Sequence, residues 1–209
     1  MVAKQGSSPK SQRTHARGSR ARQLRIIGGT WRGRRWRFGA SADIRPTPDR
    51  VRETLFNWLG TRVVGARCLD LFAGSGALGL EALSRGAAAV RFVESHAAAA
   101  RELATVLAEW GAPQASVTRS DALRFLQAAP QPYDIVFLDP PFAAGLIAPA
   151  AERLERGGWL APRALIYVEC AAREGLPVLP ASWQLAKAKR AGEVGYHLLE
   201  RAARGDDPR

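Results

Sequence analysis

A carboxylate, two prolines and an aromatic residue stand together as Asp139-Pro140-Pro141-Phe142, directly after the apolar run of residues 133–138. The carboxylate and a proline carbonyl can accept hydrogen bonds from a planar exocyclic amine, and the aromatic ring can stack on the base that carries it. Fixing both N–H bonds aims the amine nitrogen at an incoming methyl group. We therefore predict Asp139, Pro140 and Phe142 as catalytic residues that methylate a nucleobase amine, with Asp139 orienting the amine and receiving its proton.

A glycine-rich loop about seventy residues earlier indicates a cofactor. The segment 74–79 matches the G-x-G-x-x-G fingerprint of dinucleotide-binding enzymes, and Glu94 follows where a ribose-binding acid would stand. A nicotinamide-dependent dehydrogenase is therefore an alternative. Asp70 disfavours it, because a carboxylate next to the loop would repel a pyrophosphate but could pair with the ammonium of S-adenosylmethionine.

The acids at the next two strand ends are also suited to binding S-adenosylmethionine. Glu94 can accept hydrogen bonds from both ribose hydroxyls, and Asp121 is placed for the adenine amine, beside the backbone N–H of Ala122. Ligands of open parallel sheets bind at the carboxyl ends of the strands, where these acids are expected. The predicted cofactor-binding residues are Asp70, Phe72, Gly74, Gly76, Glu94, Asp121 and Ala122.

Alternating strands and helices must position these residues. Strands are predicted at 67–71, 90–94, 115–119, 134–138 and 164–169, and helices at 77–85, 97–110, 121–128 and 147–156. This alternation predicts an α/β fold with a doubly wound, mostly parallel sheet. Residues 183–201 are predicted to add two strands that form a hairpin around 190–193.

The N-terminal part is organised differently. Residues 24–38 predict a basic hairpin in which aromatic residues alternate with arginines, and Thr47 or Asp49 could cap a helix that carries Val51 and Leu55. We expect a disordered basic tail at 1–23, an RNA-binding hairpin and helix at 24–60, the methyltransferase domain at 61–203 and a flexible end at 204–209.

Charge is concentrated at the N-terminus. The net charge of the 209 residues is +12; residues 1–37 hold eleven basic residues and no acid, which leaves 31 − 11 = 20 basic against 19 acidic residues. A local polycation indicates a polyanionic partner such as nucleic acid. Two cysteines in apolar runs, without metal-ligand spacing, favour a metal-free protein of the reducing cytoplasm. No apolar run reaches the length of a membrane span.

The motifs together resemble those of the RsmD-type methyltransferases, over most of residues 24–201. The matching blocks are Arg25-Ile26-Ile27-Gly28-Gly29, Arg32-Gly33-Arg34, Arg45-Pro46-Thr47, residues 50–59, residues 70–76, residues 139–142 and residues 191–196. The block from 45 to 59 is the most specific, because generic methyltransferases lack it. The tail of residues 1–23 is longer than the resemblance requires.

The resemblance implies a seven-stranded sheet that ends in an antiparallel hairpin, S-adenosylmethionine as methyl donor, and methylation of the N2 amine of a guanine in 16S ribosomal RNA. The substrate would be a small-subunit assembly intermediate, and we expect a cytoplasmic monomer. The predicted RNA contacts are Arg32, Arg34, Arg45, Thr47 and Arg50.

Three alternatives stay open. An adenine-N6 methyltransferase acting on DNA or RNA is the nearest, because the Asp-Pro-Pro-aromatic motif serves both amines. A nicotinamide oxidoreductase leaves residues 139–142 unexplained, and a non-catalytic RNA-binding protein leaves the cofactor loop unexplained.

Overall fold

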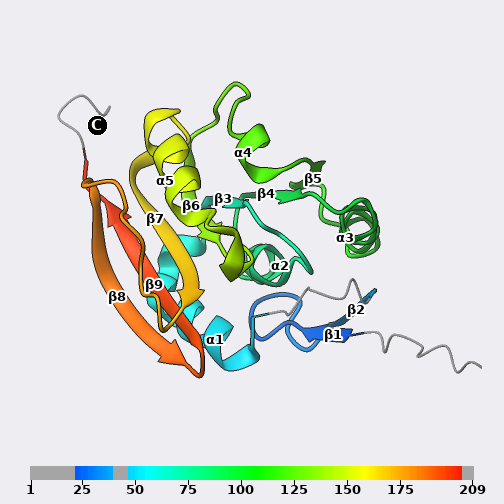
Figure 1. The fold of residues 1–209 in the computed structure, drawn as a ribbon. Helices are drawn as coiled ribbons and strands as arrows, with labels where there is room; N and C mark the ends of the chain where they lie inside the picture. The colour runs from blue at the N-terminus through cyan, green and yellow to red at the C-terminus, as the bar shows by residue number, and fades with distance from the viewer. Residues whose placement is uncertain (1–21, 40–46, 204–209) are drawn as a thin grey trace, which may run out of the picture.

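A computed structural model of the chain describes residues 22–39 and 47–203. Its centre is a seven-stranded sheet in the order β5-β4-β3-β6-β7-β9-β8 (Figure 1). The strands are β3 (Arg67–Asp70), β4 (Ala89–Glu94), β5 (Ala115–Arg119), β6 (Tyr133–Leu138), β7 (Leu160–Ala171), β8 (Trp183–Ala191) and β9 (Val194–Arg201). Strands β3 to β7 are parallel, and β9 runs antiparallel to both β7 and β8.

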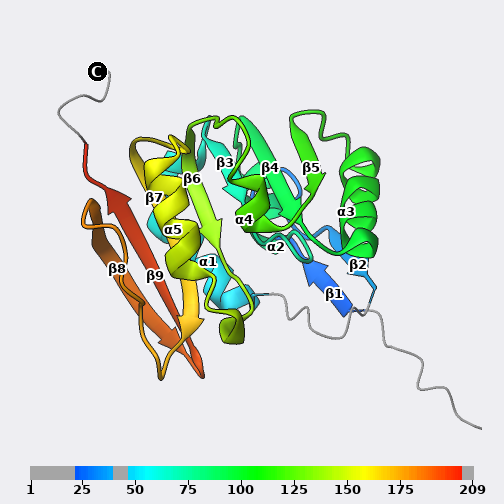
Figure 2. The same ribbon diagram turned by 45° about the horizontal axis from the view of Figure 1, so that its top comes forward.

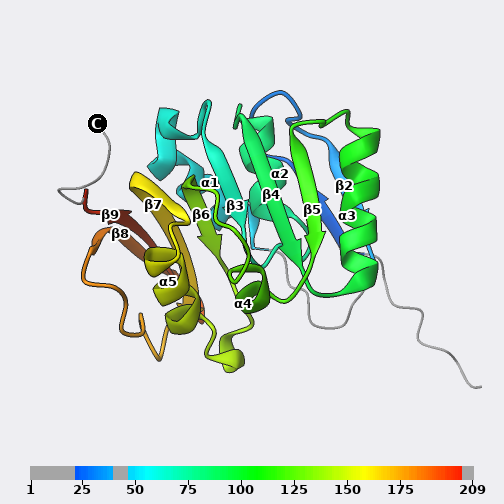
Figure 3. The same cartoon turned by 90° about the horizontal axis from the view of Figure 1, so that it is seen from above.

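Helices cover both faces of the sheet (Figure 3). One face carries α1 (Asp49–Leu59), α2 (Ala77–Ser84) and α3 (Ala97–Glu109), and the other carries α4 (Ala122–Phe125) and α5 (Ile147–Arg156). Each face has its own buried apolar cluster. Strands buried on both sides need near-continuous apolar sequence, as β6 has, and such burial is the main stabilising contribution.

The predicted fold class is confirmed, with the five parallel strands close to their expected places. Strand β7 begins earlier than expected, because a register irregularity between Tyr133 and Ile135 lets Leu160 pair with Tyr133. Helix α4 is shorter than the predicted 121–128. The predicted C-terminal hairpin is β8 and β9, joined through Gly192 and Glu193.

The basic N-terminal hairpin is also present, as β1 (Arg22–Arg25) paired antiparallel with β2 (Arg35–Phe38). Leu24, Ile26 and Phe38 are buried in the cluster of the α1–α3 face, so the hairpin packs onto the main sheet layer. Strand β1 begins inside the predicted tail of residues 1–23, because its backbone pairs with β2. The rest of that tail, residues 1–21, lies outside the described residues, as do Arg45 and the end at 204–209.

The predicted capping of α1 by Thr47 or Asp49 is wrong. Pro48 is the N-cap residue, and the helix has no side-chain cap. Asp49 lies inside the first turn, where a carboxylate suits the helix dipole, and the Thr47 hydroxyl bonds to Asp139 instead. The helix is held by its buried face, which includes Val51 and Leu55.

Within the described residues, no helix is long and apolar enough to cross a membrane. The same residues contain no group of three or more His, Cys, Asp or Glu side chains that could hold a metal ion.

Candidate active site

Parallel strands bring the predicted site residues to one edge of the sheet. Asp70 ends β3, Glu94 ends β4, Asp121 follows β5 and Asp139 follows β6, all at the carboxyl ends of the arrows (Figure 2). The charges of Asp139 and Glu94 each raise the pKa of Asp70, so these three carboxyl groups act on one another electrostatically. The acids separated by up to 69 positions in the sequence thus form one acidic edge.

Asp70 lies beneath the glycine loop. Its Oδ2 accepts a hydrogen bond of 3.0 Å from the backbone N–H of Gly79, in the first turn of α2. Burial raises the pKa of Asp70 to about 7, although that hydrogen bond lowers it. A cofactor ammonium beside Asp70 would favour its ionised form, so the predicted pairing is chemically consistent with this site.

Two glycines of the loop are required, one by its backbone conformation and one by close packing against a neighbouring strand. Gly76 has a φ of 76°, a left-handed conformation that favours glycine, and it precedes the first residue of α2. A Cβ on Gly79 would lie 2.1 Å from the Phe92 ring, so this glycine lets α2 approach β4. The loop therefore turns sharply and brings the N-terminus of α2 to the acidic edge.

Glu94 connects the loop to the turn that follows β4. Its Oε2 accepts a hydrogen bond of 2.8 Å from the Gly74 N–H, and its Oε1 accepts one of 2.6 Å from the His96 N–H. The His96 Nδ1 also lies 2.9 Å from Oε1. Oε2 has a second lone pair, which leaves acceptor capacity for a ribose hydroxyl. Nothing in the spacing of the sequence singled out His96.

Asp121 and Phe72 flank this cofactor region. Asp121 is the N-cap of α4, and its Oδ1 accepts a hydrogen bond of 3.0 Å from the Arg124 N–H. Asp121 is exposed, whereas Ala122 is buried. Phe72 is half-buried against the cluster of the α4–α5 face. Contact of Asp121 and the Ala122 backbone N–H with the adenine stays a prediction.

Asp139 is the centre of the predicted catalytic motif. The hydroxyl of Thr47, which precedes α1, donates a hydrogen bond of 3.3 Å to Asp139 Oδ2. Burial raises the pKa of Asp139 to about 6, and the Thr47 hydrogen bond opposes that rise. Pro140 is buried behind it, while Phe142 is 39% exposed in a short 3-10 helix, η2 (Phe142–Ala144). A carboxylate held in place beside an exposed aromatic ring is the arrangement predicted for binding an aminated base.

A second acid, Glu169, lies next to Asp139 and was not predicted. Leu138 of β6 pairs with Val168 of β7, so the residues that follow each of them are neighbours on one face of the sheet. Glu169 is buried, and its Oε1 accepts a hydrogen bond of 2.8 Å from the Tyr167 hydroxyl. Burial first, and the charge of Asp139 second, raise the pKa of Glu169 well above its usual range. The two neighbouring acids therefore disfavour ionisation of each other.

Buried Arg52 holds the Thr47 segment in position. Its Nε donates a 3.2 Å hydrogen bond to the Thr47 carbonyl, and its Nη1 forms a 3.3 Å ion pair with Glu81 of α2. Its Nη2 donates to the carbonyl of Arg25 and to Asp49. Burial lowers the pKa of Arg52, and the charges of Glu81 and Asp49 oppose that shift. The segment that bonds Asp139 is thereby anchored to the helix that follows the glycine loop.

Glu81 joins the hairpin to this anchor. Its two oxygens accept hydrogen bonds of 2.9 and 2.8 Å from the backbone N–H groups of Ile27 and Gly28, and Arg85 pairs with it at 2.8 Å. The side chain of Glu81 is fully buried, so its charge depends on these three donors and on Arg52. Hairpin, α1 and α2 thus share one buried ionic network.

The predicted RNA-contacting arginines divide into two groups. Arg50 is exposed and lies three residues from Thr47, near Asp139. Arg34 instead lies over the ring of Trp110, 5.5 Å from its centroid, and Trp110 ends α3 at the opposite, amino end of the sheet. Arg32 lies in the same hairpin turn as Arg34. The structure therefore does not bring Arg32 and Arg34 to the acidic edge.

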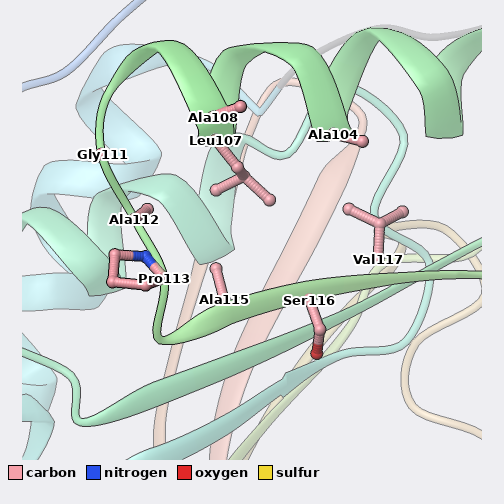
Figure 4. Close-up of a pocket in the computed structure, with 9 residues that line it drawn as sticks. All are labelled: Ala104, Leu107, Ala108, Gly111, Ala112, Pro113, Ala115, Ser116 and Val117. Atoms are coloured by element: carbon pink, nitrogen blue, oxygen red, sulfur yellow. The ribbon is translucent and has the colours of Figure 1, made fainter.

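A shallow apolar groove of about 390 Å³ lies between α3 and β5 (Figure 4). Its lining includes Leu107, Pro113 and Val117 and no charged side chain. It opens at the start of β5, whereas the predicted catalytic residues follow the carboxyl ends of the strands. The groove is separate from the candidate active site.

Comparison with known proteins identifies the family. The family model described as "Conserved hypothetical protein 95" matches residues 24–200. The ribosomal RNA small subunit methyltransferase D of Escherichia coli strain K12 is 52% identical over 184 residues, which cover 88% of this chain and 93% of that protein. The Haemophilus influenzae protein of the same name is 46% identical over 85% of this chain and 94% of its own length. The chain belongs to the ribosomal RNA small subunit methyltransferase D family.

Solved structures agree with this membership. The structure of Escherichia coli yhhF is 50% identical and has a TM-score of 0.81, covering 87% of this chain and 99% of that one. As a member of the methyltransferase D family the chain is an enzyme, and the predicted methyl donor, S-adenosylmethionine, is confirmed with the family. The resemblance inferred from the sequence motifs is confirmed as well.

Proposed function

We propose that this enzyme transfers the methyl group of S-adenosylmethionine to the exocyclic N2 amine of a guanine in small-subunit ribosomal RNA. The observation that carries the proposal is Asp139, a half-buried carboxylate held by Thr47 directly after β6, three residues before the exposed ring of Phe142. Relatives that share 52% and 46% of their residues with this chain are named for small-subunit ribosomal RNA.

The substrate base leaves its stack and enters the site between Asp139 and Phe142. Its ring stacks on Phe142, and the amine N–H groups donate to the Asp139 carboxylate and to the carbonyl of Pro140. The nitrogen lone pair then points at the methyl carbon. The new N–C bond forms as the S–C bond breaks, and the amine loses a proton to Asp139, directly or through water.

The glycine loop would hold the methyl donor, Asp70 would pair with its ammonium, and Glu94 would accept hydrogen bonds from its ribose. Asp121 and the Ala122 backbone receive the adenine. Arg50 and Arg45 contact the RNA near the target base, whereas Arg32 and Arg34 bind phosphates farther away. Thr47, predicted as an RNA contact, is buried with its hydroxyl on Asp139 and acts by holding that carboxylate. We place the reaction in the cytoplasm, on a small-subunit assembly particle, with the enzyme as a monomer.

The direct test is incubation with undermethylated small-subunit particles and labelled S-adenosylmethionine, followed by nucleoside analysis of the RNA. We expect N2-methylguanosine at one position. The same acceptors fit the N6 amine of adenine, so N6-methyladenosine as the product would establish that alternative and reject the guanine assignment. Parallel reactions with protein-free 16S RNA should be slower if the particle is the substrate.

Asp139→Ala tests the role of the carboxylate. The variant should fold and bind S-adenosylmethionine with unchanged affinity, because its proposed partner is the target amine. Loss of one orienting charged acceptor should reduce turnover by about 10²-fold or more. Asp139→Asn should be less affected, since its amide oxygen still accepts one hydrogen bond. Replacement of the exposed Glu152 by alanine is the matched control, and near-normal turnover of a folded Asp139→Ala enzyme would rule out the mechanism.

A further inference from the structure

Two lysines on the edge strand β8 lie in the same rows of the sheet as Glu169 and Tyr167 of β7. Tyr196 of β9 pairs with Glu169 of β7 on one side and with Lys189 of β8 on the other. Leu198 pairs in the same way with Tyr167 and Lys187. Strands are spaced about 4.8 Å apart, so the Lys189 backbone lies roughly 10 Å from that of Glu169.

Both lysines project from the face that carries α1. Directly paired residues point to the same side of a sheet, and Tyr167, Tyr196 and Leu198 all belong to the buried cluster of the α1–α3 face. Trp58 of α1 stacks on Tyr196 at 5.4 Å between ring centroids and closes that cluster. One strand farther out, the side chains at 187 and 189 are exposed.

The end of β8 lies at the catalytic edge. Because β9 is antiparallel to both β7 and β8, β8 runs parallel to β7, and its last residues are level with the carboxyl end of β7 (Figure 1). Residues 183–191 hold three cations and no acid, and the next acid is Glu193 in the turn. Arg190 is in register with Gly195, so it faces away from α1, and its Nε donates to the Gly192 carbonyl.

We propose that Lys187 and Lys189 form an RNA-binding surface that holds backbone phosphates beside the nucleotide entering the active site. This rests on the proposed function, because it assumes an RNA substrate. The catalytic pocket itself is acidic and would repel the phosphates that flank a target base. Two cations about three strands from Asp139 neutralise those phosphates at the pocket's border, where Arg50 adds a third cation on the side of α1.

Lysines on an edge strand have another common use, which is to prevent edge-to-edge pairing between molecules. That role would give the lysines no effect on RNA affinity and a clear effect on association between copies of the chain. Substitution of the lysines should therefore change RNA affinity in the first role and self-association in the second.

The test compares three double variants. Lys187→Gln/Lys189→Gln removes both charges, and Lys187→Arg/Lys189→Arg keeps them. Arg62→Gln/Arg156→Gln is the control, which removes two exposed cations at the other end of the sheet. Binding of small-subunit RNA is measured against salt concentration. The glutamine pair should lower the slope of log affinity against log salt by about 2, one for each phosphate contact. The arginine pair should keep the slope, and S-adenosylmethionine affinity should not change in any variant.

Lysine footprinting supplies an independent readout, because the chain has only four lysines, at 4, 10, 187 and 189. Bound RNA should protect Lys187 and Lys189 from an amine-reactive reagent. An unchanged salt slope with no protection, in an enzyme that still methylates its RNA, would overturn the surface and leave the function intact. Self-association of the glutamine variant with unchanged RNA binding would assign the lysines to protection of the sheet edge. Failure of the wild-type enzyme to methylate any RNA would instead reject the proposed function.

Discussion

At the scale of single residues, the ionisation of the Asp139 carboxyl group should control activity. Burial places its pKa at about 6, above that of an ordinary aspartate. Only the ionised carboxylate can accept both the hydrogen bond and the proton of the amine, so kcat/KM should fall as pH decreases through about 6. A pH profile at saturating S-adenosylmethionine measures this. Asp139→Asn should lose that acid limb, and a wild-type profile that is level down to pH 5 would contradict the assignment.

Glu169 should act in its protonated form. Glu169→Gln keeps an acceptor for the Tyr167 hydroxyl without a charge, so its turnover at neutral pH should stay close to that of the wild type. Glu169→Ala loses the hydrogen bond and should be slower by about fivefold, or roughly 1 kcal/mol. The discriminating readout is the alkaline side of the pH profile. There the wild type should decline as Glu169 ionises beside Asp139, and the glutamine variant should not.

Glu94 has both a structural and a ligand-binding role. Glu94→Ala should weaken S-adenosylmethionine binding by about 1–3 kcal/mol, because ribose hydroxyls would lose their acceptor and the Gly74 N–H would be released. Calorimetry gives the affinity, and His96→Ala, which keeps the carboxylate and its bond to the loop, is the comparison. Undiminished affinity in a folded Glu94→Ala protein would remove Glu94 from the cofactor site.

At the scale of elements, one buried ion pair holds the hairpin, α1 and α2 together. Arg52→Met should destabilise the fold by about 3–5 kcal/mol, because it removes one of the two cations paired with buried Glu81 and frees the Thr47 carbonyl. Arg62→Gln, which breaks an exposed pair with Glu200, should cost less than about 1 kcal/mol. Denaturant unfolding compares the two. Equal losses would show that the buried network contributes no more than a surface pair.

At the scale of the whole molecule, the N-terminal cluster of basic residues is distinct from the acidic edge that carries the catalytic residues. Residues 1–21 carry many of the N-terminal cations, whereas the catalytic edge is acidic. Deleting residues 1–21, rather than 1–23, keeps β1 intact. The deletion should weaken RNA binding and flatten its salt dependence without changing the methylated nucleotide, since phosphate contacts carry little sequence information. An unchanged salt slope would mean that the tail takes no part in binding.

The sequence by itself determined the elements and the motifs at their ends. Strong apolar runs such as 133–138 define strands, and Asp70, Glu94 and Asp139 each stand at or directly after a strand end, where local spacing is enough to predict their common edge. Asp139-Pro140-Pro141-Phe142 and the glycine loop then indicated the chemistry, because each is a short contiguous motif.

Only the tertiary structure decided which distant side chains meet. Glu169 becomes the neighbour of Asp139 through the register of β6 and β7, and Arg52 meets Glu81 because α1 packs beside α2. The hairpin turn docks against Trp110 and thereby carries Arg34 away from the site. Register and packing depend on contacts between segments far apart in the chain, and the spacing of residues within any one segment does not specify them.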